Sequence, residues 1–347
     1  MIHWELTRDH ANLSKWVAIA LLLVPAAVEG DDPGRISKAD AATANGGNAN
    51  RIRVAAISFE PVKLALEANA ARLSEAFEKA AANGAKIAVA PEGILEGYIV
   101  NEIIVGRIPA ERMNDVAIPV DDPLIGKFRK QAERLDMCLV FGFAEKDGAD
   151  VFNTAVFIDD AGVIRGRYRK MQLAEGCHPD WWFDRLGTQA RAFETPFGRC
   201  GILICNDRWN PLLAGILKAD GAQFLAIPSF GSTSRAQDDA VLARSVENGI
   251  PVVEANVGVT LVASGAKIVA LDRQITGITY AEIEIPPASE PDQAERDRLE
   301  MRFLRQRIRE MPRRYMQTIG KIRAADDRQE SETPAKVLEQ AAGRVNR

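Results

Sequence analysis

The chain has 347 residues, of which 47% are hydrophobic and 27% charged, and this balance excludes a disordered, collagenous or many-pass membrane protein. Its 44 basic and 48 acidic residues give a net charge of −4, so neither nucleic acid nor an anionic membrane is expected as the main partner. The three histidines, His3, His10 and His178, are too few for a histidine-rich zinc site.

The N-terminus contains an apolar run over residues 16–28. Its 13 residues fall short of the roughly 20 that span a bilayer, but they match the hydrophobic region of a signal peptide. We therefore expect residues 1–30 to be a signal peptide that exports the protein, with a cytoplasmic location as the alternative. Residues 31–51 have no periodic apolar face and predict a flexible linker.

Short β-rich runs alternate with helical runs from residue 52 to residue 286. Strands are expected over residues 52–58, 86–90, 137–144, 151–158, 163–168, 201–205, 224–227, 251–256 and 277–285, with a hairpin over 259–271. Helices are expected over 64–83, 123–135, 212–219 and 238–248. Because hairpins occur among the alternating elements, we expect an α/β protein with mixed sheets, as two sheet layers between helices.

A charged helix is predicted after this unit, as an extension over residues 287–323. Met301, Leu304, Ile308 and Met311 recur at helical spacing, and Pro312 is expected to kink or split the helix. Residues 324–347 are charged and rich in alanine, and predict a frayed tail.

Three chemically useful side chains stand where apolar runs end: Glu92, Lys170 and Cys205. Ligand sites of α/β sheets collect beyond the carboxyl ends of strands, so a carboxylate, an amine and a thiol there suggest a nucleophilic site. Each residue also has a simpler explanation when taken alone. Glu92 fits a solvated loop, Lys170 a surface cation and Cys205 a buried core thiol.

Three segments resemble motifs of the nitrilase, or carbon–nitrogen hydrolase, superfamily. They are IAVAPEGILEGY at 87–98, FNTAVFIDDAGVIRGRYRK at 152–170 and GILICNDRWNP at 201–211. The resemblance implies a nitrilase-like α-β-β-α sandwich over residues 52–286, commonly paired into homodimers or higher homo-oligomers. It also implies that Glu92 is a general base, Lys170 stabilises an oxyanion and Cys205 is the nucleophile, while Asn153 buttresses the site.

The reaction implied by the resemblance is hydrolysis of a non-peptide C–N bond in a small amide or N-carbamoyl compound. It would proceed through a cysteine thioester, release ammonia, and need neither a metal nor a cofactor. Two alternatives stay open: a nitrilase acting on a C≡N group, and a catalytically inactive binding member of the same fold.

The residues after Cys205 are similar to those of N-carbamoyl-D-amino-acid amidohydrolases. This similarity implies that Arg208 holds a substrate carboxylate, since a guanidinium can bind both oxygens. The alternative is that Arg208 pairs with Asp207 or another local carboxylate. Further substrate contacts are expected from Asn206, Trp181 and His178. The resemblance also implies a second acidic site residue, for which the candidates are Glu175, Asp180 and Asp184.

Overall fold

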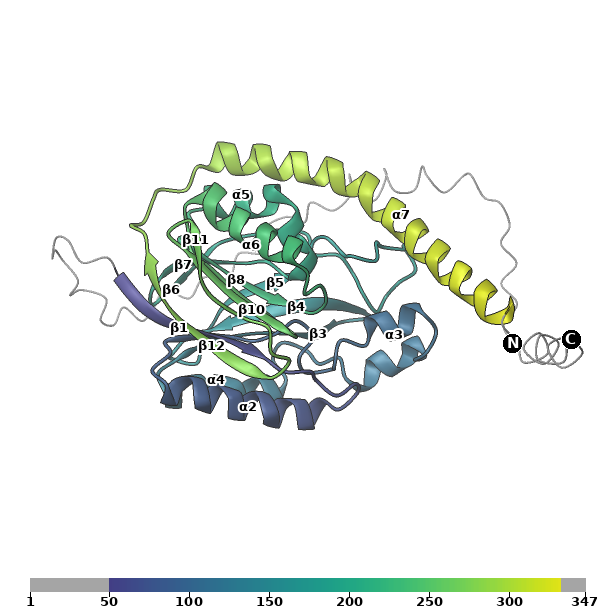
Figure 1. Ribbon diagram of the computed structural model, residues 1–347, viewed down its shortest axis with the longest axis horizontal. Coiled ribbons are helices and arrows are strands. Elements are labelled where there is room, and N and C mark those ends of the chain that lie inside the picture. The colour runs from purple at the N-terminus through teal and green to yellow at the C-terminus, as the bar shows by residue number, and fades with distance from the viewer. Residues whose placement is uncertain (1–49, 332–347) are drawn as a thin grey trace, which may run out of the picture. The chain divides into compact units, whose positions relative to one another are not determined.

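The computed structural model describes residues 50–331 (Figure 1). The expected signal peptide, the linker up to residue 49 and the tail beyond residue 331 lie outside the described residues. The strands are β1 (Asn50–Ser58), β2 (Ile87–Val89), β3 (Cys138–Asp147), β4 (Asp150–Ile158), β5 (Ile164–Arg169), β6 (Phe193–Thr195), β7 (Gly198–Ile202), β8 (Phe224–Ser229), β9 (Val252–Asn256), β10 (Val259–Ser264), β11 (Lys267–Asp272) and β12 (Gly277–Ile285). The helices are α2 (Leu66–Ala82), α3 (Val100–Ile104), α4 (Pro123–Leu135), α5 (Pro211–Ala219), α6 (Arg235–Asn248) and α7 (Gln293–Ser331), with 3-10 turns η2 (Ala110–Asp115) and η3 (Cys205–Trp209).

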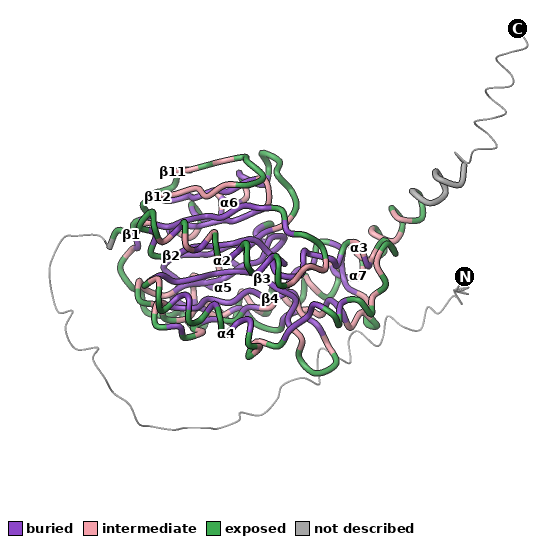
Figure 2. The backbone as a smooth tube through the Cα atoms, turned by 90° about the horizontal axis from the view of Figure 1, so that it is seen from below, coloured by how far each residue is buried: buried purple, intermediate pink, exposed green. Residues whose placement is uncertain are grey.

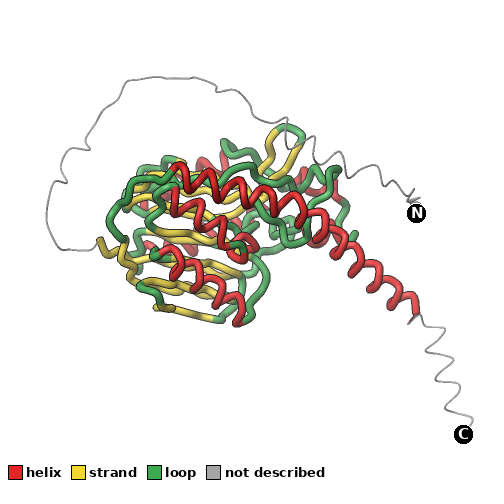
Figure 3. The backbone as a smooth tube through the Cα atoms, turned by 90° about the horizontal axis from the view of Figure 1, so that it is seen from above, coloured by secondary structure: helices red, strands yellow, loops and turns green. Residues whose placement is uncertain are grey.

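The strands form two six-stranded mixed sheets. One has the order β12-β1-β2-β3-β4-β5, and the other has the order β11-β10-β9-β8-β7-β6. Helices α2 and α4 cover the outer face of the first sheet, and α5 and α6 cover the second (Figures 1 and 3). The expected α-β-β-α sandwich with mixed sheets is thereby confirmed.

Strand β1 shows how the sequence builds the layers. Successive residues of a strand point to opposite faces, and here both faces are buried (Figure 2). Val54 and Ala56 enter the core between the sheets, whereas Ala55 and Ile57 pack under α2 and α4. β1 pairs in parallel with β2 on one side and antiparallel with β12 on the other, so the two ends of the domain sequence meet in one sheet.

Helix α4 illustrates the local signals that fix element ends. Asp122 caps it by accepting a hydrogen bond of 2.8 Å from the Leu124 N–H, and Pro123 occupies the first helical position. The helix ends at Leu135, and the next residue, Asp136, caps it in the left-handed conformation with a φ of +49°.

Two expectations need correction. The strand expected over 201–205 ends at Ile202, and Cys205 instead opens η3, because its φ of +44° is incompatible with a strand. Of the two effects expected at Pro312, a kink or a split, the split does not occur, since α7 continues through that residue as one helix. Met311, directly before the proline, is buried, and Tyr315, after it, packs on His178 and Trp181, so packing contacts hold the helix on both sides of the proline. Within residues 50–331, no helix combines the length and the apolar character that crossing a bilayer requires.

Candidate active site

Glu92 follows β2 and is fully buried. Its Oε1 accepts hydrogen bonds from Lys170 Nζ at 2.6 Å and from Asn153 Nδ2 at 2.7 Å. Its Oε2 accepts the backbone N–H of Phe230 at 3.0 Å. Three donors from three different segments therefore fix one carboxylate in place, and Asn153 is one of them.

Lys170 follows β5 and is also fully buried. Its N–H donates to the Asn153 carbonyl and its own carbonyl accepts from Gly187, both at 2.8 Å. Burial alone would lower the pKa of Lys170, but the surrounding acidic groups, Glu92 first among them, together outweigh burial, and the pKa rises well above its usual value. The site thus contains a buried ion pair, an arrangement that requires close geometry because two charges have left water.

Cys205 is the first residue of η3, and its backbone adopts the left-handed conformation. This conformation is strained for any residue other than glycine. The strain is held by Asp207, which accepts from the Ile204 N–H at 3.0 Å, from Tyr168 Oη at 2.8 Å and from the Gln172 N–H at 2.9 Å. Burial raises the pKa of Asp207 to about 6. Asp207 therefore ties the turn carrying the thiol to the segment carrying the lysine, a role that the sequence did not reveal.

The thiol of Cys205 shares a backbone neighbour with Glu92. Its Sγ donates to the Phe230 carbonyl at 3.4 Å, while the N–H of the same Phe230 donates to Glu92. Burial and then the charge of Glu92 raise the pKa of Cys205 to about 11, against the opposing charges of Arg208 and Lys170. The structure therefore brings Glu92, Lys170 and Cys205 together, with the thiol protonated at neutral pH.

Arg208 does not present a free guanidinium. The residue is 1% exposed, and its Nη1 donates to Glu254 Oε1 at 2.8 Å and to Ser229 Oγ at 2.9 Å. Its carbonyl accepts from Arg244 Nη1 at 2.8 Å. The ion pair with Glu254 corresponds to the alternative of a local carboxylate partner, although that partner is not Asp207.

The three acidic candidates after the lysine differ in burial. Asp180 is exposed, whereas Glu175 and Asp184 are buried. Burial, followed by the charge of Glu175, raises the pKa of Asp184 well above its usual value. The two carboxyl groups therefore act as a pair, and their charges also act on Lys170. A cavity of about 10 Å³, which fits a single water molecule, lies beside Asp184, Asn153 and Tyr98.

The other residues expected to contact substrate have partners within the chain. Asn206 Nδ2 donates to the Gln172 carbonyl at 2.9 Å, which again joins the thiol turn to the lysine segment. The His178 and Trp181 rings pack against Tyr315 of α7, with ring centroids 4.8 Å and 5.4 Å away.

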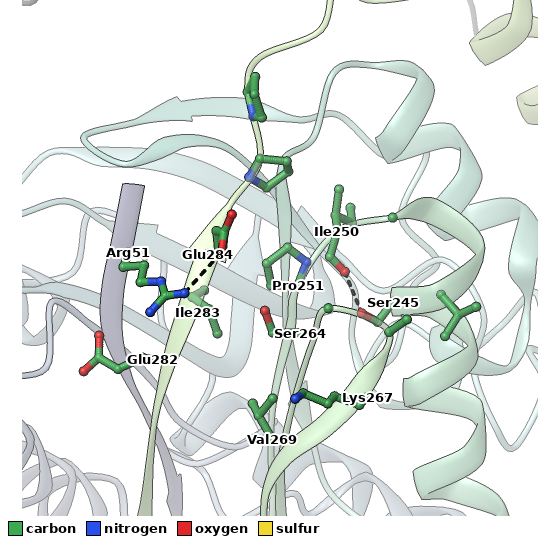
Figure 4. A pocket seen from close by; sticks show the side chains of 16 residues that line it. Arg51, Ser245, Ile250, Pro251, Ser264, Lys267, Val269, Glu282, Ile283 and Glu284 are labelled. Carbon is green, nitrogen blue, oxygen red and sulfur yellow. Dashed lines mark hydrogen bonds and ion pairs between the residues drawn. The ribbon is translucent and has the colours of Figure 1, made fainter. Parts of the chain in front are cut away.

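A larger hollow of about 700 Å³ lies at the opposite ends of the strands (Figure 4). Pro251 at the start of β9 lines it, whereas Glu92 and Phe230 follow the carboxyl ends of β2 and β8. Two of the polar groups labelled in Figure 4 have partners there: Arg51 pairs with Glu284 at 3.7 Å, and Ser245 Oγ donates to the Ile250 carbonyl at 2.8 Å. This hollow is separate from the candidate active site.

Solved structures of known proteins share the fold of this chain. The solved structure of an amidase from Nesterenkonia sp. superposes with a TM-score of 0.58 at 20% identity, covering 73% of this chain and 96% of the amidase. Nit3 of Saccharomyces cerevisiae gives a TM-score of 0.58 at 22% identity, covering 67% and 90%. Another structure of the Nesterenkonia amidase shows acrylamide added to its active-site cysteine.

Two curated relatives match part of the chain. A bifunctional nitrilase/nitrile hydratase of Lupinus angustifolius is 29% identical over 187 residues, covering 51% of this chain and 53% of the relative. A citrullinase of Francisella tularensis is 29% identical over 164 residues, covering 46% and 55%. The chain thus spans about half the length of the curated relatives it matches.

The two mixed sheets between helix layers place the chain in the nitrilase-fold class. The carbon-nitrogen hydrolase family matches residues 53–288, which is more than half of the chain. The chain belongs to the carbon-nitrogen hydrolase family.

Proposed function

We propose that this protein hydrolyses a non-peptide C–N bond of a small amide or N-carbamoyl compound and releases ammonia. The observation that carries the proposal is the buried Glu92–Lys170 pair beside a thiol on a strained turn. The acrylamide adduct on the cysteine of the related amidase supports the choice of Cys205 as nucleophile.

In the proposed reaction, Glu92 takes the proton of Cys205 as the sulfur attacks the carbonyl carbon. Lys170 and the backbone N–H of Asn206 stabilise the oxyanion that forms. Glu92 then returns the proton to the departing nitrogen, so the C–N bond breaks, ammonia leaves and a thioester remains. Water, deprotonated by Glu92, attacks the thioester, and the acid product leaves while the thiol regains its proton.

The charge of the site bears on the substrate. Lys170 and Arg208 are the cations that act on Cys205, and each is already paired with a buried carboxylate. Small amides and N-carbamoyl compounds without a free carboxylate therefore fit best. A close tie to N-carbamoyl-D-amino-acid amidohydrolases would instead require Arg208 to leave Glu254, an exchange that costs a buried ion pair.

The test is ammonia release by the full chain from simple amides, ω-amides, N-carbamoyl amino acids, ureido compounds and nitriles. Release from amide or ureido substrates that disappears in Cys205→Ala is the expected result. Cys200→Ala is the matched control, because Cys200 is a buried thiol outside this site. Turnover of nitriles alone would replace the proposal with the nitrilase alternative. Absence of turnover and of any acyl adduct on Cys205 would favour an inactive binding member.

Arg208→Ala is expected to lower activity by a similar factor on carboxylate-bearing and neutral substrates, because the side chain holds the Cys205 turn. Glu254→Gln, which weakens the same ion pair from the other side, should give the same substrate-independent loss. Comparing kcat/KM of both variants on one neutral and one carboxylate-bearing substrate checks this. A rise in KM confined to carboxylate substrates in Arg208→Ala would restore the substrate-binding role.

Export through residues 1–30 and assembly into homo-oligomers remain predictions. Mass analysis of the mature N-terminus and light scattering of the purified protein test them.

A further inference from the structure

Helix α7 has two distinct contact regions. Its first half packs along α5, and Phe303 is buried in the hydrophobic cluster that includes the apolar residues of α5. Its middle part, from Arg307 to Thr318, contacts the segment over residues 171–187, which follows Lys170 and carries Glu175 and Asp184. One helix thus joins the body of the domain to the loop beside the candidate site.

The backbones of α7 and this loop touch. Gly176 has φ +84°, and a Cβ on it would lie 2.1 Å from the Tyr315 nitrogen, so only glycine fits there. Cys177 N–H donates to the Met311 carbonyl at 3.4 Å, and Thr318 Oγ1 donates to the Glu175 carbonyl at 3.0 Å. The residues on both sides of Gly176 are therefore held by α7.

Two arginines of α7 extend these contacts. Arg307 Nη1 donates to the Gly187 carbonyl at 2.6 Å, and Gly187 itself donates to the Lys170 carbonyl. Arg314 Nη1 lies 3.5 Å from the Ala174 carbonyl and 3.5 Å from Asn206 Oδ1. The contacts of α7 thus reach the neighbours of both Lys170 and Cys205.

Aromatic packing completes the contact. The Tyr315 ring lies between His178 and Trp181 at centroid distances of 4.8 Å and 5.4 Å. In turn, Trp181 packs on Phe183, the residue before Asp184, at 5.4 Å. Glu175 and Asp184 thus both lie within a few residues of direct α7 contacts.

We propose that the segment Arg307–Thr318 of α7 is a positioning element that holds the Glu175–Asp184 carboxyl pair in place beside Lys170 and Glu92. This inference rests on the proposed function. None of the α7 residues touches the reacting atoms; they act through the loop. When the loop moves, the Glu175–Asp184 carboxyl pair moves relative to the Glu92–Lys170 pair, and the proton transfers of the reaction change.

The test compares Tyr315→Ala with Tyr315→Phe and with Gln317→Ala in the full chain. Phenylalanine keeps both ring contacts, and Gln317 is an exposed residue of the same helical turn. Tyr315→Ala is expected to lower kcat by about 10- to 100-fold, since small misplacements near a reacting centre have effects of that size. It should also shift the pH profile of kcat, with little change in the melting temperature, whereas Tyr315→Phe and Gln317→Ala keep wild-type kinetics.

A second readout does not depend on a substrate. In Tyr315→Ala, amide hydrogen exchange within residues 171–187 should become at least tenfold faster, while exchange in β1 to β4 stays unchanged. Wild-type kcat together with unchanged loop exchange would overturn the inference. So would equal acceleration in both sheets, because that would reveal a general loss of stability. If the wild-type protein turns over no substrate, the proposed function fails, and the exchange experiment still decides whether α7 holds the loop.

Discussion

Replacing Glu92 with glutamine is expected to lower ammonia release by about 10²- to 10⁴-fold, the usual contribution of a positioned proton-transfer group. The substitution keeps the shape of the side chain, and one oxygen can still accept from Lys170 and Asn153. It removes the group that takes the proton from Cys205. Turnover should therefore fall although substrate still binds.

The same substitution is expected to lower the pKa of Cys205 from its value of about 11. Glu92 raises this pKa by like-charge repulsion, and once it is neutral the thiolate becomes the anionic partner of Lys170. Alkylation of Cys205 by iodoacetamide, followed as a function of pH by peptide mass, measures the shift. Faster alkylation at neutral pH combined with lost turnover separates the electrostatic effect of Glu92 from its proton transfer.

Glu145→Gln is the matched control for this experiment. Glu145 is 1% exposed and forms ion pairs with Arg167 and Arg169. It accepts from Thr154, whose side chain points to the opposite face of β4 from that of Asn153. Its loss should leave the pKa of Cys205 unchanged. An equal alkylation shift in both variants, or a turnover unaffected by Glu92→Gln, would contradict the assigned role of Glu92.

Lys170→Met is expected to lower the free energy of unfolding by about 3–5 kcal/mol, because it leaves the buried carboxylate of Glu92 without its cation. Asn153 and the Phe230 N–H still donate to that carboxylate, so the chain should fold. Lys86→Met is the control, since Lys86 pairs with Asp136 at the surface, where water screens the charges and the loss stays within about 1 kcal/mol.

The double variant Glu92→Gln/Lys170→Met should recover most of the lost stability while remaining inactive. In the double variant neither buried charge is left unpaired. The loss of unfolding free energy in the double variant should therefore be smaller than the sum of the two single losses, and this difference measures the coupling between Glu92 and Lys170. Denaturant unfolding of the wild type, both single variants and the double variant gives the four free energies of this cycle. Additive losses would show that the two groups do not form a stabilising pair.

Helices and strands with clear capping residues or clear alternation of apolar and polar residues were predicted well. The helix expected over 123–135 and the strand expected over 277–285 match α4 and β12 in full, because capping and alternation lie within each segment. The order of Glu92, Lys170 and Cys205 also pointed to one site. The conformation of Cys205 could not be predicted, because its left-handed φ depends on Asp207 contacts with Tyr168 and Gln172.

The partner of Arg208 could not be predicted from the sequence either, because this contact also joins residues that are distant in the chain. The carboxylate that pairs with Arg208 belongs to Glu254, which lies 46 residues further along the chain on strand β9. From the sequence, the partner of Arg208 was expected to be a substrate carboxylate or a local acid. Glu254 could not be found in this way, because only the pairing of β9 with β8 brings it within reach of Arg208. The contact between α7 and the loop after Lys170 was hidden for the same reason.

The position of β1 has a consequence for the order in which the domain assembles. One edge of β1 pairs with β12, and the register joins Asn50 to Ile285, so this pairing closes a loop that contains nearly the whole domain. Pairings this distant in sequence form late and slow the folding rate, because the chain must give up the entropy of a long loop first. During synthesis, β1 has one unsatisfied edge until residue 285 has emerged from the ribosome. The domain can therefore complete its first sheet only after nearly all of it has been translated.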